Sequence, residues 1–133
     1  MKIEHIAYNV EDPAEVAKWY GTHCGLTVVR RLPGPAQAHF LADDQSTVLE
    51  IYCNPPDKVP VYGEWDPLLF HLGFASADPA SDQARLIAAG ATLLTDDTLP
   101  DGSQLVMLRD PWGLAIQLCH RAQPLIGADS GKG

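Results

Sequence analysis

Four side chains that can bind a divalent metal ion recur at nearly constant spacing in this sequence. His5 and His71 are 66 positions apart, and Glu50 and Gln117 are 67 positions apart. Two imidazoles, a carboxylate and an amide oxygen suit a borderline divalent cation such as Zn, Ni, Fe, Co or Mn. In a six-coordinate shell, four protein ligands leave positions open for water or for a bidentate substrate, as in catalytic metal sites.

The residues around each histidine repeat as well, which indicates a duplicated unit. Segment 4–14 recurs in outline as segment 70–80, with a histidine, an aspartate, a proline and an alanine all matched at the offset of 66. Such internal repeats indicate one supersecondary unit used more than once. In both copies an Asp-Pro pair, at Asp12 and at Asp78, is typical of a helix N-cap and first helical residue.

The order of elements is predicted to be the same in both halves: strand, helix, then three strands. Glu50 and Gln117 each lie in the middle of the last strand of their half. A pseudo-twofold arrangement of the halves would bring them together with His5 and His71. The expected strands are 2–10, 26–31, 36–42 and 47–52, then 68–75, 91–95, 104–108 and 114–120, with helices after Asp12-Pro13 and after Asp78-Pro79.

Each of the four residues also has an ordinary structural interpretation. A single strand histidine or glutamine is commonly a hydrogen-bonding residue without a metal. Glu50, however, stands between Leu49 and Ile51, where an unpaired carboxylate would be costly to bury and a cation would remove that cost. Four matched positions favour a joint metal site.

Composition limits the partners and the setting. The net charge of −8 argues against nucleic acid or an anionic membrane as partner and tolerates a cationic ligand. Three cysteines without a Cys-x-x-Cys pair indicate neither a disulfide framework nor a thiolate zinc site. The amino terminus lacks a signal pattern, and no apolar run reaches the length of a membrane span, so we expect a cytoplasmic protein.

The chain is expected to form one domain over residues 1–122, with module one at 1–54, a proline-rich linker at 55–66 and module two at 67–122. Residues 123–133 are expected to be a flexible tail. In the linker, Tyr62 and Trp65 either fold over a cavity as a lid or pack in an irregular loop. Trp65 is thus a candidate substrate contact. So is His39, the best placed of the three unmatched histidines to line a cavity.

These motifs resemble the vicinal oxygen chelate superfamily, which includes glyoxalase I, methylmalonyl-CoA epimerase, extradiol dioxygenases and the fosfomycin and bleomycin resistance proteins. The resemblance covers residues 1–121 and is carried by segment 4–6, the strand around Glu50, segment 70–74, and the Asp-Pro-Trp-Gly-Leu-Ala-Ile-Gln-Leu sequence at 110–118. It implies an α+β fold of two βαβββ modules related by pseudo-twofold symmetry, like the glyoxalase, bleomycin resistance and dihydroxybiphenyl dioxygenase proteins. It also implies a homodimer.

Within that superfamily, the order of His5, Glu50 and His71 is similar to bacterial glyoxalase I, and Asn54 matches a position that helps hold glutathione. Two residues depart from the pattern. Asn9 stands where an arginine is common, and Gln117 replaces a carboxylate that doubles as a proton-transfer base. A glutamine cannot accept a proton, and losing a general base typically costs on the order of 10²- to 10⁴-fold in rate. Glu50 is then the candidate base.

The leading hypothesis is therefore a metal-dependent lyase or isomerase of glyoxalase I type that chelates a small substrate through two neighbouring oxygens. One alternative is a metal-free, ligand-sequestering binding protein of the bleomycin resistance kind. For that alternative, the negative charge suits a cationic drug, on which Trp65, Tyr62 and Trp112 would stack. Another alternative is an extradiol-type dioxygenase with iron at His5, Glu50 and His71.

Overall fold

The computed structural model describes residues 1–127, and the chain divides into two compact units, the first Met1–Pro60 and the second starting at Val61. Both units have the order strand, helix, three strands, so the prediction of an α+β fold with two βαβββ modules is confirmed. The first unit contains β1 (Ile6–Asn9), α1 (Pro13–Cys24), β2 (Thr27–Arg31), β3 (His39–Ala42), β4 (Val48–Tyr52) and the short 3₁₀ turn η1 (Pro56–Lys58). The second contains the 3₁₀ turn η2 (Tyr62–Glu64), β5 (Leu72–Ala75), α2 (Pro79–Ala88), β6 (Thr92–Thr98), β7 (Gln104–Arg109) and β8 (Ala115–His120).

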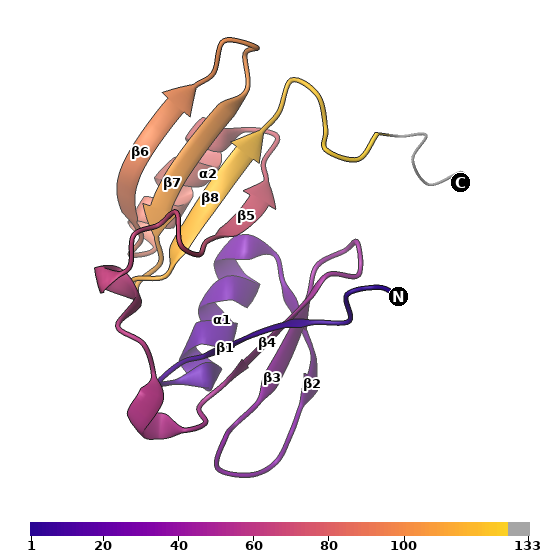
Figure 1. Ribbon diagram of the computed structural model, residues 1–133, viewed down its shortest axis with the longest axis vertical. Helices are drawn as coiled ribbons and strands as arrows, with labels where there is room; N and C mark the ends of the chain where they lie inside the picture. Colours follow the sequence, from indigo (N-terminus) through magenta and orange to yellow (C-terminus); the bar gives the residue numbers. More distant parts are fainter. Residues whose placement is uncertain (128–133) are drawn as a thin grey trace. The chain divides into compact units, whose positions relative to one another are not determined.

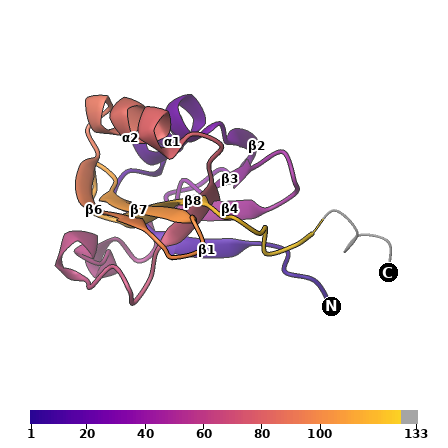
Figure 2. The ribbon, with the colours of Figure 1, turned by 90° about the horizontal axis from the view of Figure 1, so that it is seen from above.

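Each unit forms one mixed four-stranded sheet with a helix on one face (Figure 1). The strand orders are β1-β4-β3-β2 and β5-β8-β7-β6. The first strand of each unit runs parallel to the last, and the remaining pairs are antiparallel. Figure 2 shows helix α2 on one side of strands β6, β7 and β8. One face of each sheet is therefore covered by its helix, and the other is available for a site.

The register of the strands confirms that the two units are copies. Ala7 pairs with Glu50 in the first sheet, and Gly73 pairs with Gln117 in the second. The backbone bond from Val10 N–H to the Tyr52 carbonyl (2.8 Å) has its counterpart between Ser76 and Cys119 (2.9 Å). Glu50 and Gln117 thus occupy equivalent positions, as their spacing in the sequence predicts.

Both helices begin where the Asp-Pro pairs predict. The Asp12 carboxylate accepts a hydrogen bond from the Glu15 N–H (3.2 Å), and Asp78 does the same for Ser81 (3.1 Å). These caps satisfy N–H groups that have no partner inside the helix. Helix α1 then buries Val16, Trp19 and Tyr20, the kind of apolar burial that supplies most of a helix's stability in a protein.

The first strand of each unit is shorter than its apolar pattern predicts. Residues 67–69 form a turn, because Asp66 accepts hydrogen bonds from the backbone N–H groups of Leu68 (through Oδ1, 2.9 Å) and Leu69 (through its carbonyl, 2.9 Å). Leu68 and Leu69 are both exposed there. Strands β1 and β5 therefore start immediately after His5 and His71.

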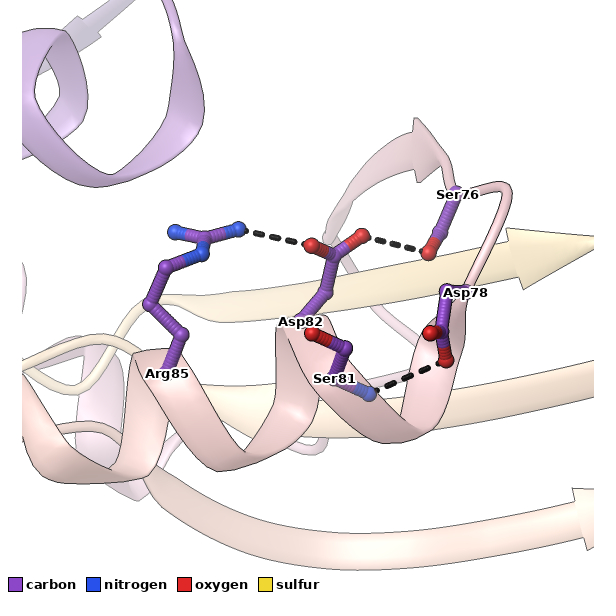
Figure 3. A network of polar contacts seen from close by, with 5 residues as sticks. All are labelled: Ser76, Asp78, Ser81, Asp82 and Arg85. Carbon is purple, nitrogen blue, oxygen red and sulfur yellow. Dashed lines mark hydrogen bonds and ion pairs between the residues drawn. The ribbon is translucent and has the colours of Figure 1, made fainter.

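At the start of α2 the second unit carries a polar network that the first unit lacks (Figure 3). The buried Ser76 hydroxyl donates to Asp82 Oδ2 (2.5 Å), and Arg85 donates to Asp82 Oδ1 (2.8 Å). These bonds to Ser76 and Arg85 lower the pKa of the Asp82 carboxyl from 3.8. At the equivalent positions of the first unit, Val10 and Val16 are both buried.

The second half of the linker packs as an irregular loop on the end of β7. The Arg109 guanidinium donates to the backbone carbonyls of Tyr62 (3.1 Å), Trp65 (2.8 Å) and Gly113 (2.9 Å). Gly113 has a φ of +93°, and a Cβ there would lie 2.6 Å from the nitrogen of Gly63. These contacts favour the packed-loop alternative over a lid for this segment.

Two further observations concern the chain as a whole. Among residues 1–127, no helix is long and apolar enough to cross a membrane. The expected flexible tail, 123–133, lies in large part outside the described residues, which end at 127.

Candidate functional site

The first unit places His5 directly against Glu50. His5 immediately precedes β1 and lies two residues before Ala7, so an extended backbone directs both side chains to the same face of the sheet. Ala7 is paired with Glu50 on the neighbouring strand β4. The result is a distance of 3.1 Å from His5 Nε2 to Glu50 Oε2, with the Glu50 side chain only 19% exposed.

The other ring nitrogen of His5 is held by a carboxylate. His5 Nδ1 lies 2.7 Å from Glu4 Oε2. This hydrogen bond to Glu4 raises the pKa of the His5 imidazole, and the nearby charges of Glu4 and Glu50 act in the same direction. An imidazole that donates from one nitrogen to a carboxylate and presents the other to a second group is the usual arrangement of metal-binding histidines.

A pocket of about 560 Å³ opens beside this pair, wholly within the first unit. Small side chains, Ala7, Ala36 and Ala38, leave the space that larger residues would fill. The pocket is large enough for a small organic ligand. Its remaining lining residues are His5, Glu50, Leu32, Pro33, Tyr52 and Asn54.

Asn54, predicted as a substrate contact, does line this pocket, and Asn9 fixes its backbone. The Asn54 N–H donates to Asn9 Oδ1 (2.7 Å), and Asn9 Nδ2 donates to the carbonyl of Pro55 (2.9 Å). These two bonds attach the end of β1 to the segment that follows β4. Asn9 is therefore a positioning residue. In the sequence it stands out only because an arginine is common at this position in the superfamily that the chain resembles.

The second unit also fixes its histidine through Nδ1, but no polar contact joins His71 to Gln117 among residues 1–127. His71 Nδ1 lies 2.9 Å from the carbonyl of Pro67, which fixes the ring through the nitrogen that corresponds to His5 Nδ1. Gln117 lies next to Gly73 on the neighbouring strand, and its Oε1 accepts a hydrogen bond from Cys119 Sγ (3.3 Å). Burial raises the pKa of the Cys119 thiol, which keeps it a protonated donor.

The four expected metal ligands are divided between the two units. Each unit by itself supplies two of the four expected ligands: His5 with Glu50, and His71 with Gln117. Within residues 1–127, no three His, Cys, Asp or Glu side chains gather as a metal-binding group. Imidazole nitrogen with carboxylate or amide oxygen is nevertheless a suitable donor chemistry for the expected cations.

Two other predicted contacts are not among the lining residues of the pocket beside Glu50. His39 is paired with Ile51 and Arg31, on the face of the sheet that α1 covers, and it lines a different pocket of the first unit. Trp65 belongs to the second unit, where its ring packs edge-on against Tyr62 at a centroid distance of 5.1 Å. Tyr62 is buried, so its ring is not open for stacking on a ligand.

A duplicated βαβββ unit, with a histidine before each first strand and a polar residue within each last strand, defines the class of vicinal oxygen chelate proteins. The family profile described as glyoxalase-like domain matches residues 5–119. The chain belongs to this family, within the glyoxalase and bleomycin resistance group of the superfamily. No curated protein sequence matches the chain.

Solved structures with this fold include enzymes and binding proteins. A glyoxalase-related enzyme from Fulvimarina pelagi superposes with a TM-score of 0.69 at 23% identity, covering 96% of this chain and 94% of its own. Lactoylglutathione lyase from Agrobacterium tumefaciens gives 0.64 at 23% identity, covering 89% and 92%. TnmS3, an antibiotic binding protein from Streptomyces sp. CB03234, gives 0.69 at 20% identity, covering 90% and 94%. At these identities the likeness establishes the fold alone.

Proposed function

We propose that this protein is a divalent-metal-dependent enzyme of the glyoxalase-like kind, a lyase or isomerase acting on a small substrate with two neighbouring oxygen atoms. The observation that carries the proposal is the His5–Glu50 pair: 3.1 Å between Nε2 and Oε2, with Nδ1 oriented by Glu4. His71, fixed through Nδ1 by the Pro67 carbonyl, gives independent support from the second unit.

The proposed ligands are His5, Glu50, His71 and Gln117, and Zn, Ni, Fe, Co and Mn all suit this set. The metal, when bound, supplies Lewis-acid polarisation of the substrate oxygens. Asn54, held by Asn9, offers an amide to orient the substrate in the pocket. The apolar residues Leu32 and Pro33 form part of its lining.

Glu50 is the proposed proton-transfer group. Its carboxylate lines the pocket and is the acceptor able to take a proton from a carbon next to the chelated oxygens and to return it. Gln117, at the equivalent position of the second unit, cannot do so. Proton transfer is therefore expected from the Glu50 side alone, which favours a reaction on one stereoisomer of the substrate.

Metal analysis of the purified protein tests this proposal. Protein from metal-supplemented cultures is expected to retain stoichiometric metal after dialysis, and His5→Ala and His71→Ala are each expected to lose it. His23→Gln is the matched control, because His23 lies on α1 against Trp19 and outside the pocket. A wild-type protein that stays free of metal under these conditions overturns the proposal.

A second candidate function is metal-free binding of a ligand, and the lining of the same pocket favours it. Leu32, Pro33 and Tyr52 face a single carboxylate, Glu50, which suits a cation with an apolar body. Calorimetric titration of bleomycin into chelator-treated protein distinguishes the two functions. Tight binding that Glu50→Gln weakens supports this candidate, and no binding excludes it for that drug.

A further inference from the structure

The first unit has a second pocket, of about 710 Å³, on the opposite side of its sheet from Glu50. It lies between α1 and strands β2 and β3. Ala14, Ala17 and Gly21 stand at helical spacing along α1, and their small side chains leave a hollow against the sheet. Leu26 and Val28 give the hollow apolar walls.

Basic side chains gather at this pocket although the chain as a whole is strongly acidic, with 9 Lys and Arg against 17 Asp and Glu. Lys18, Arg31 and His39 line it, and Glu15 is the one acidic residue among the lining residues. Arg31 and His39 are directly paired across β2 and β3, so their side chains lie side by side on the helix-facing side.

Two of these three basic groups, Lys18 and Arg31, make no polar contact that stabilises the fold in the part of the chain that the structure describes. Among residues 1–127, Lys18 and Arg31 form no ion pair or side-chain hydrogen bond, whereas Arg85 and Arg109 both do. His39 is 92% buried, and its Nδ1 is engaged by the Gln37 carbonyl at 2.6 Å. Because Nδ1 donates to that carbonyl, Nε2 of the neutral imidazole is an acceptor, so Lys18 and Arg31 are the groups available to bind an anion.

We propose that this pocket binds a small amphipathic organic anion, with a carboxylate near Lys18 and Arg31 and an apolar tail along Ala14, Ala17 and Leu26. A carboxylate matches the planar donor fork of an arginine and forms charge-assisted hydrogen bonds with it. The apolar part of the ligand fills the hollow left by the small residues of α1. This site is separate from the Glu50 pocket and does not depend on the function proposed for it.

Titration of ¹⁵N-labelled protein with sodium hexanoate, followed by two-dimensional NMR, tests the proposal, and 1-hexanol is the uncharged probe of similar size. Hexanoate is expected to shift the amide signals of residues 14–22 and 26–31, and 1-hexanol is expected to bind more weakly. Arg31→Gln and Lys18→Gln are each expected to weaken hexanoate binding about 3- to 10-fold, the range for loss of one exposed charge contact.

Arg30→Gln is the matched control, because Arg30 neighbours Arg31 on β2 but is paired with Phe40 and points to the other face of the sheet. It removes the same charge and is expected to leave hexanoate affinity unchanged. The proposal is overturned if the shifts cluster at Glu50 and Asn54, if 1-hexanol binds as well as hexanoate, or if Arg31→Gln and Arg30→Gln behave alike. Unchanged spectra outside the pocket verify that the variants are folded.

Discussion

At the scale of single residues, Asn9 connects the first strand to the pocket. Its side chain makes two hydrogen bonds with the backbone at residues 54 and 55, and so fixes where Asn54 leaves β4. Asn9→Ala removes both bonds and is expected to lower the free energy of unfolding by about 1–3 kcal/mol, at roughly 0.5–1.5 kcal/mol for each. Urea unfolding of the two proteins measures this difference.

Asn9→Asp affects the two bonds differently. An aspartate still accepts from the Asn54 N–H, but its second oxygen and the Pro55 carbonyl are both acceptors and repel each other, so a loss of stability is expected here too. Equal stability of Asn9→Ala and wild type would mean that the 54–55 backbone is held by other contacts.

The sequence predicts the ligand types better than it predicts the residues that position them. His5 and Glu50 are recognisable because an imidazole and a carboxylate at repeat positions have few structural uses. Asn9 instead bonds to the backbone 45 positions further along the chain, at residue 54. Arg109 bonds to the backbone 47 and 44 positions before it, at residues 62 and 65. No periodicity in the sequence signals such long-range side-chain to backbone bonds, so only coordinates reveal them.

At the scale of elements, the polar network at the start of α2 makes stability depend on pH. The folded state lowers the pKa of Asp82 below its ordinary value of 3.8. The ionised carboxylate therefore contributes its full share to the free energy of unfolding above pH 3.8, and this share is lost as the pH falls through the lowered pKa of the folded state. Asp82→Asn is expected to be less stable than wild type by about 1 kcal/mol at neutral pH. That difference is expected to shrink below pH 3.8.

Urea unfolding at several pH values on both sides of 3.8 measures this effect. Arg85→Met is the comparison, since it removes one hydrogen bond but leaves the bond between Ser76 and Asp82 intact. A stability difference for Asp82→Asn that stays constant with pH would show that the carboxylate charge is not what stabilises the start of α2.

The close approach of η2 to the turn after β7 predicts that stability is sensitive to substitution of a glycine in that turn. Gly113 and Gly102 both have positive φ, +93° and +89°, but only Gly113 meets another backbone segment, at Gly63. Gly102→Ala is expected to cost about 1–2 kcal/mol from backbone strain alone. Gly113→Ala adds a clash with the Gly63 backbone and is expected to cost clearly more. Thermal unfolding of both variants measures the contrast, and equal losses would contradict the contact.

The element prediction fails where local turn chemistry overrides an apolar pattern. Residues 68–70 read as part of a strand, yet the Asp66 side chain and carbonyl capture the next backbone N–H groups and make a turn. The error matters little for the site, because His71 still lies immediately before β5. Helix starts were predictable because an Asp-Pro pair has one dominant local use.

At the scale of the whole molecule, duplication explains both what the sequence predicts and what it leaves open. The shared spacing of the repeated residues predicts the order of strands and helix in each unit, and the register confirms that Glu50 and Gln117 are equivalent. Equal offsets carry no information on how two copies approach each other, since that depends on surfaces outside the repeat. The pairing of His5 and Glu50 with His71 and Gln117 around one metal, and a homodimer, therefore stay predictions.

The replacement of a carboxylate by Gln117 gives a test of that four-ligand site as a whole. If the ligands of both units share one metal ion, Gln117→Glu adds a negative charge to its shell. The metal affinity is then expected to rise about tenfold, which corresponds to about 1.4 kcal/mol. Competition with a chromophoric chelator measures the affinity of the purified, metal-loaded protein.

Glu50→Gln makes the opposite change at the equivalent position of the first unit and is expected to lower the affinity. The double variant, with both residues exchanged, keeps the ligand charge of the wild type and is expected to bind metal with nearly wild-type affinity. A response of the same metal affinity to both single variants, at residues 67 positions apart, is what a shared metal ion predicts. A double-variant affinity that departs from the sum of the two effects indicates direct coupling between the residues. An affinity that responds to Glu50→Gln but not to Gln117→Glu would remove Gln117 from the ligand set and leave the metal to His5, Glu50 and His71.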